Sequence, residues 1–166
     1  MPSDPIAAII ARYHQLDNLP MDTLFDFRPT NREMDVMPFA QESLDQLRLH
    51  GDTYFSNGEW RMASDYYELY LRTQHDEAIA TRLSHCYFKR NRYAEAMELI
   101  RDNMKNDSTR VEALYETGTL FIHAEKPFDA RDAFAAATQV ADKMKRNGRT
   151  PPEAAKQAKR ELAKLE

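Results

Sequence analysis

Two clusters of side chains in this chain have the residue types that chemistry requires, namely His85-Cys86 and His75-Asp76-Glu77. A Cys–His pair works as nucleophile and base only when the two side chains share a proton. Neighbouring residues of a helix point about 100° apart, so His85 and Cys86 cannot share one from a helix. We therefore expect Cys86 to pack in the core. The second cluster falls in a turn predicted between two helices, where we expect solvated side chains and no bound metal.

The rest of the composition excludes further classes of active site. The 166 residues include four glycines and one cysteine, which leaves no glycine-rich phosphate loop, no internal disulfide and no cysteine-based zinc site. No catalytic constellation is found. We expect an all-α binding protein and not an enzyme, with no cofactor.

The charge pattern and the N-terminal apolar run bear on partners and location. The net charge is -4, yet residues 143–166 carry eight Lys/Arg and three Glu. A solvated amphipathic helix is the preferred interpretation over a nucleic-acid or lipid site, because aromatic residues do not interleave with these cations. The run Ile6–Ala11 is too short to cross a membrane. We expect a cytoplasmic protein that binds no nucleic acid and does not insert into membranes.

Small and aromatic residues recur along the middle of the chain at intervals of 33 to 34 residues. Segments beginning at Leu44, Glu77 and Val111 carry them in the same order. The first segment has Gly51, Tyr54, Trp60, Ala63 and Tyr67; the second has Ser84, Tyr87, Tyr93, Ala96 and Ile100; the third has Gly118, Phe121, Ala130, Phe134 and Ala137. This pattern resembles the tetratricopeptide repeat (TPR), a hairpin of two helices.

The repeat predicts the fold and its boundaries. Small residues let the two helices of a hairpin approach closely, and aromatic residues fill the space around the contact. One hairpin cannot bury its own apolar face, so neighbours must stack. We predict a right-handed α-solenoid of three TPR hairpins at 44–76, 77–110 and 111–144. In the third hairpin Pro127 stands where the repeat has an aromatic residue, and proline suits the first turn of a helix. We expect the neighbouring Phe128 to fill the space that the missing aromatic ring would occupy.

The flanking segments differ from the repeats. Asp4-Pro5 is expected to begin a short amphipathic helix, whose apolar side is Ile6, Ile9, Ile10, Tyr13 and Leu16. Residues 20–43 hold three prolines among apolar residues, so within the N-terminal unit 1–43 we expect an ordered, irregular arm. That arm could dock on a partner, or in the groove of its own or a neighbouring chain. We expect Thr150 to cap a last helix within 150–166 that covers the end of the solenoid.

The resemblance implies where a ligand binds. In TPR proteins the first helices of the hairpins line a concave groove, and the matching positions are occupied here by Arg48, Asp52, Phe55, Thr81, His85, Phe88, Lys89, Tyr115, Thr119 and Ile122. Spacings of three and four residues place the members from each segment on one helix face. Phe55, Phe88 and Ile122 could instead pack between repeats. A co-chaperone clamp for a terminal carboxylate is unlike this site, because Asp52, Glu112 and Glu116 would repel the ligand.

The layout of a helical arm, three hairpins and a closing helix resembles the class II chaperones of bacterial type III secretion. Short phrases such as Leu44–Leu47 and Ala141–Lys143 are also similar. The resemblance implies a chaperone that holds an extended segment of a hydrophobic secreted translocator in its groove, and a homodimer formed through the N-terminal arm. The alternative is a scaffold subunit built permanently into a larger complex.

Overall fold

The structure, a computed structural model, describes residues 4–17 and 43–166, and every regular element in these ranges is an α-helix. The elements are α1 (Pro5–Asp17), α4 (Leu44–Ser56), α5 (Trp60–Thr73), α6 (Glu77–Lys89), α7 (Tyr93–Asn103), α8 (Asp107–His123), α9 (Pro127–Arg146) and α10 (Glu153–Leu165). The predicted all-α class is confirmed for these ranges. Residues 20–42 of the predicted arm lie outside them, so the interpretations placed on that segment stay predictions.

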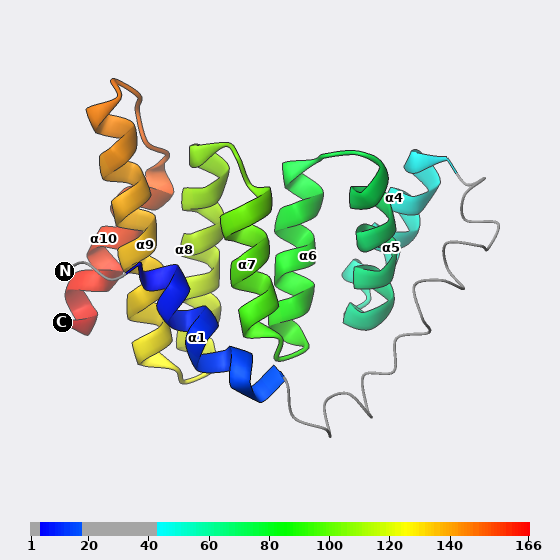
Figure 1. Cartoon of the computed structure of the whole chain (residues 1–166), viewed down its shortest axis with the longest axis horizontal. Helices are drawn as coiled ribbons and strands as arrows, with labels where there is room; N and C mark the ends of the chain where they lie inside the picture. The colour runs from blue at the N-terminus through cyan, green and yellow to red at the C-terminus, as the bar shows by residue number, and fades with distance from the viewer. Residues whose placement is uncertain (1–3, 18–42) are drawn as a thin grey trace.

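Helices α4 to α9 stand side by side in a row, with α4 and α5 at one end and α9 at the other (Figure 1). The pairs α4–α5, α6–α7 and α8–α9 pack closely, and α10 lies against α8 and α9. Helix α1 crosses the row and contacts α7 and α9, far from α4, the next described helix along the chain (Figure 1).

The three hairpins share one turn geometry. Each turn has a residue with positive φ, namely Gly58 (73°), Asn91 (62°) and Glu125 (59°). Directly after it, a backbone N–H donates to the carbonyl five residues earlier, as in Arg92 N to Tyr87 O at 2.8 Å. The left-handed conformation costs a non-glycine residue about 1–2 kcal/mol, so its recurrence 33 and 34 residues apart marks structurally equivalent turns.

Two glycines set the helix spacing within the first and third hairpins. A Cβ atom on Gly51 would lie 2.6 Å from a ring carbon of Tyr67, and one on Gly118 would lie 2.4 Å from a ring carbon of Phe134. Both rings are fully buried. The predicted close-contact role of these glycines is confirmed.

The helix starts follow their capping residues. Ser43 and Gln46 form a capping box at α4, and the Asp76 carboxylate accepts hydrogen bonds from the N–H groups of Ala78 and Ile79 at α6. Helix α8 begins at Asp107, four residues before the predicted frame start, because the Asn106 side chain accepts from the N–H of Ser108 at 2.9 Å.

Two details of the prediction near α9 and α10 were wrong. Thr150 does not cap α10, which starts at Glu153 after Pro152 without a side-chain cap. Phe128 does not fill the gap beside Pro127, since its side chain is 69% exposed; its ring lies against the Arg131 guanidinium instead. Pro127 does occupy the first turn of α9 as expected.

The position of α1 completes the core. Ile6, Ile9, Ile10 and Tyr13 are buried in the cluster that also contains the apolar faces of α7, α8 and α9. The Asp4 carboxylate accepts from the N–H of Ile6 at 3.0 Å, as expected for the helix start. The apolar run at the N-terminus is therefore one face of a packed helix.

Candidate functional site

The predicted groove residues lie on α4, α6 and α8, the first helices of the three hairpins. Contacts between side chains run from one first helix to the next. Asp52 of α4 pairs with Arg82 of α6, and His85 of α6 pairs with Glu116 of α8. These two pairs connect the same side of α4, α6 and α8 and include the selected residues Asp52 and His85.

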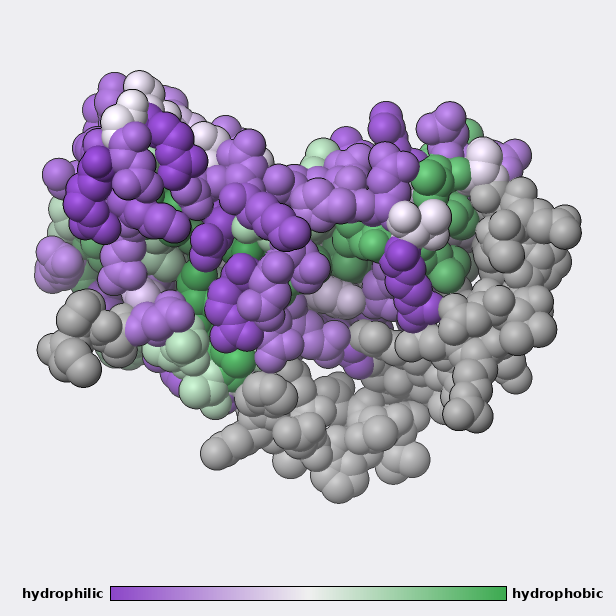
Figure 2. Space-filling model, turned by 45° about the horizontal axis from the view of Figure 1, so that its top comes forward, coloured by the Kyte–Doolittle hydropathy of each residue, from purple (hydrophilic) through white to green (hydrophobic). Residues whose placement is uncertain are grey.

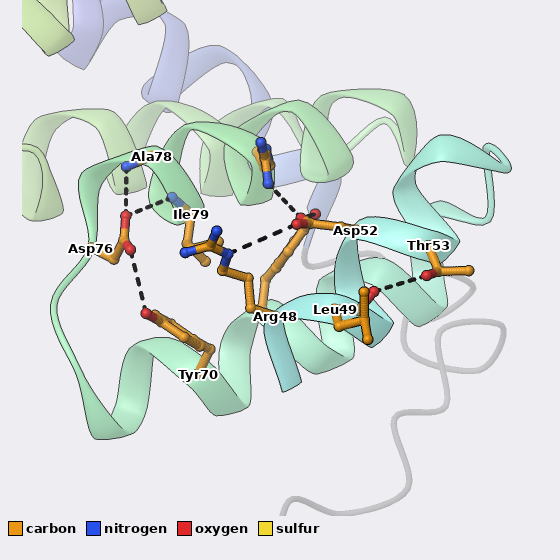
Figure 3. Close-up of polar contacts among 10 residues, drawn as sticks. Arg48, Leu49, Asp52, Thr53, Tyr70, Asp76, Ala78 and Ile79 are labelled. Carbon is orange, nitrogen blue, oxygen red and sulfur yellow. Dashed lines mark hydrogen bonds and ion pairs between the residues drawn. The ribbon is translucent and has the colours of Figure 1, made fainter. Parts of the chain in front are cut away.

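One part of this face is a charged network around Asp52. The carboxylate receives Arg82 at 2.5 Å and the Tyr67 hydroxyl at 2.6 Å, and Arg48 lies 4.0 Å away on the next turn of α4 (Figure 3). Burial, and then the hydrogen bond to Asp52, raise the pKa of the Tyr67 hydroxyl. Because Arg82 and Arg48 are half exposed, this part of the face presents cations that are already oriented by a shared carboxylate.

The centre of the face is aromatic. The rings of Phe55, Trp60 and His85 lie within 5.3–5.4 Å of one another, centroid to centroid. The Lys89 ammonium lies 6.0 Å from the centre of the Trp60 ring, a cation–π distance. All three rings are only partly buried, so they offer an apolar contact surface edged by a positive charge.

Helix α8 forms the part of this face that lies beyond α6. Oε1 of Glu116 lies 2.7 Å from Nδ1 of His85. Ile122 is 39% exposed and is the uncovered large apolar side chain of this helix. Tyr115 leans on Phe134 of the core with ring centroids 5.9 Å apart, and the Thr119 hydroxyl donates to the carbonyl of Tyr115. The hydroxyl of Thr81 on α6 likewise donates to its own helix, at Glu77.

Phe88 is a correction. It was placed among the groove residues, with packing between repeats as the alternative. Its side chain is 6% exposed and its ring packs edge-on against Phe121 of the next hairpin and against Tyr93, at 4.8 and 4.9 Å, so the alternative holds for this residue. Tyr13 of α1 adds a further ring to this cluster through Tyr93. As it stands in the structure, Phe88 belongs to the core.

Sequence reasoning missed Trp60 as a member of the site. The repeat pattern placed it among the residues that pack inside a hairpin. It is the first residue of α5, just past the turn after α4, and this location brings the indole beside Phe55. The available signal was the short spacing between Phe55, near the end of α4, and Trp60, at the start of α5, because a tight turn brings two such rings together.

Among the residues whose side chains could do chemistry, His85 lies on this face, whereas Cys86 and Asp76 lie apart from it. Burial raises the pKa of the Cys86 thiol to about 12, and its side chain is fully buried. Among residues 4–17 and 43–166, no three or more His, Cys, Asp or Glu side chains gather as metal ligands. Asp76 of the turn cluster caps α6, and Tyr70 donates to its second oxygen at 3.4 Å (Figure 3).

Comparison with known proteins adds no assignment. No protein-family model matches the chain, and no curated protein gives a significant match. Within the described ranges, none of the helices combines the length and apolar character needed to cross a membrane.

Proposed function

We propose that this chain is a TPR protein that binds an extended segment of a partner protein on the face formed by α4, α6 and α8. The repeated hairpin turns and the two glycine contacts support the TPR interpretation, because both recur at the repeat spacing. In TPR proteins the first helices of the hairpins share one concave side, and the residues proposed to bind lie on the first helices α4, α6 and α8.

One observation carries the proposal. A continuous row of partly exposed side chains connects α4, α6 and α8, which are not consecutive in the chain. The row runs from the Asp52–Arg82 pair, through the Phe55–Trp60–His85 rings, to Glu116. Aromatic rings flanked by acidic and basic side chains suit an extended peptide that has apolar side chains and charged residues beside them.

The most specific form of the proposal is a type III secretion translocator chaperone. The helical N-terminal element, three hairpins and closing helix support it through the resemblance in layout. A hydrophobic client would place its apolar side chains on Phe55, Trp60 and Ile122, which keeps them out of water before export.

Affinity capture from native cells tests the proposal. The chain is compared with Lys89→Glu and Ile122→Asp, two changes at exposed positions of the face, and with Phe128→Asp, which places the same charge at an exposed position on α9. We expect each groove change to reduce recovery of the partner by about tenfold or more. Lys89→Glu reverses a charge and Ile122→Asp places a charge at an apolar contact, and either change should weaken the binding free energy by over about 1.4 kcal/mol. Phe128→Asp should leave recovery unchanged.

The identity of the captured protein separates the alternatives. A partner with long apolar helices that is lost from both groove variants supports the chaperone form. A stoichiometric complex that survives both changes contradicts the proposal and favours the scaffold subunit.

A further inference from the structure

A second groove lies between α5 and α7, on the side of α6 that faces away from the proposed binding face. Its apolar lining is Ala80, Leu83 and Tyr87 of α6 with Leu71 of α5 and Leu99 of α7, and its polar lining is Glu68, Arg72, His75 and Asn103. It has a volume of about 340 Å³ and is open to solvent on one side. Such a groove between neighbouring helices has the shape that accepts one face of another helix.

The equivalent groove one hairpin further along is filled by this chain's own α1. The shift of 33–34 residues that relates the hairpin turns places Leu114, Phe121 and Ala133 where Ala80, Tyr87 and Leu99 stand. All three equivalents lie in one cluster with Ile6, Ile9 and Ile10 of α1. Helix α1 lies against α7 and α9, the two helices that border this groove (Figure 1).

The charges that hold α1 in place recur as well. Arg12 of α1 pairs with Asp129 at 2.8 Å and with Asp132 at 2.5 Å on α9. The same positions on α7 are Glu95 and Glu98. Helix α7 therefore has carboxylates at the spacing that receives the arginine of α1, and both Glu95 and Glu98 already interact within this chain, Glu95 with Arg92.

A third carboxylate, Asp102 on the next turn of α7, is bound through both of its oxygens by Arg101. The hydrogen bond from Arg101 lowers the pKa of the Asp102 carboxyl, so it is ionised at neutral pH. Hydrophilic surface covers much of the face drawn in Figure 2, and apolar patches show near the end formed by α4 and α5. Arg72 and His75 line the groove itself, so a helix with an aliphatic stripe would direct its cation toward α7, where Glu95 and Glu98 stand.

We propose that the α5–α7 groove binds an amphipathic helix of a partner protein, with aliphatic residues at i, i+3 and i+4 and an arginine or lysine next to that stripe. Helix α1 has this pattern in Ile6, Ile9, Ile10 and Arg12 and shows how such a helix seats in the equivalent groove. The site lies on the opposite side of α6 from the groove of the proposed function and does not depend on it, so the protein can hold two segments at once.

A synthetic peptide with the sequence of residues 4–17, capped at both ends and labelled with fluorescein, serves as the probe. Fluorescence polarisation with the full chain should show one peptide bound per chain. Glu98→Lys should weaken binding by about tenfold or more, because like charges then face each other. A peptide carrying Arg12→Glu should restore binding to the Glu98→Lys chain. Asn103→Trp, which places a large ring at the exposed rim, should also block the peptide.

The matched control is Asp132→Lys, which changes the groove that α1 already fills. Peptide affinity should be the same for this variant and the unchanged chain. Loss of binding in Asp132→Lys but not in Glu98→Lys would show that the peptide replaces α1 in its own groove, and would overturn the proposal. So would the absence of any binding. A dimer of the full chain that Glu98→Lys dissociates would assign the groove to α1 of a second copy and would also overturn it. Circular dichroism checks that each variant is folded.

Discussion

At the scale of single residues, the small residues decide how near the helices come. The repeat pattern identified Gly51 and Gly118 from sequence alone, because a hairpin with aromatic residues opposite needs a position without a Cβ atom. The structure confirms both contacts. For Phe88 the repeat pattern left two interpretations open, a groove position or packing between repeats, and only its tertiary contacts with Phe121 and Tyr93 decide for packing.

Gly118→Ala should destabilise the protein. The added methyl group would lie 2.4 Å from a buried ring carbon of Phe134, and overpacking of this kind costs about 1–3 kcal/mol. Urea unfolding measures the loss. Phe134→Leu should cost less in the Gly118→Ala background than alone, because the smaller side chain relieves the clash. Additive effects of the two changes would contradict the close contact.

Cys86 should resist thiol reagents up to high pH. Burial raises its pKa from about 9 to about 12, and the folded chain shields the sulfur. A raised folded pKa gives stability that is complete below pH 9 and is lost as the pH rises through 12. Ellman's reagent at pH 8.5 should label the unfolded chain quickly and the native chain only at the rate of unfolding. Immediate labelling of the native chain would contradict the buried position.

At the scale of helices, the sequence predicted which segments are helical better than where they lie. The hairpins follow from local pattern, since the turns and caps are encoded within a few residues. The docking of α1 on α7 and α9 depends on partners more than 100 residues away, such as Asp129 and Asp132 for Arg12. The alanines of α9 (Ala130, Ala133, Ala136 and Ala137) were the one available sign, because small side chains let another helix approach.

Ile9→Ala tests the docking of α1. Ile9 is fully buried between α1 and the core, and removing such a side chain typically costs about 2–5 kcal/mol. Thermal unfolding should show a clear loss of stability, with more binding of an apolar dye to the exposed faces of α7 and α9. Ala11→Ser, at an exposed position of the same helix, is the control. Equal stability of the two variants would contradict the docked position.

At the scale of the whole molecule, the central claim is that α4, α6 and α8 form one binding face. Most of its members were predicted from repeat positions, since these depend only on helix periodicity. Trp60 was not predicted, because its approach to Phe55 and His85 depends on how the turn after α4 closes. The charges of Asp52, Arg82 and Glu116 are paired across helices, so their orientation also required the tertiary structure.

Site-specific photo-crosslinking tests this claim most directly. A benzophenone amino acid is placed at Lys89, at Ile122 or at Phe128, and the adducts formed in native cells are mapped by mass spectrometry. The binding face predicts that Lys89 and Ile122 crosslink to neighbouring positions of one extended segment of a single partner, while Phe128 gives no adduct with that segment. Adducts with the same partner at Phe128 but none at Lys89 and Ile122 would contradict it.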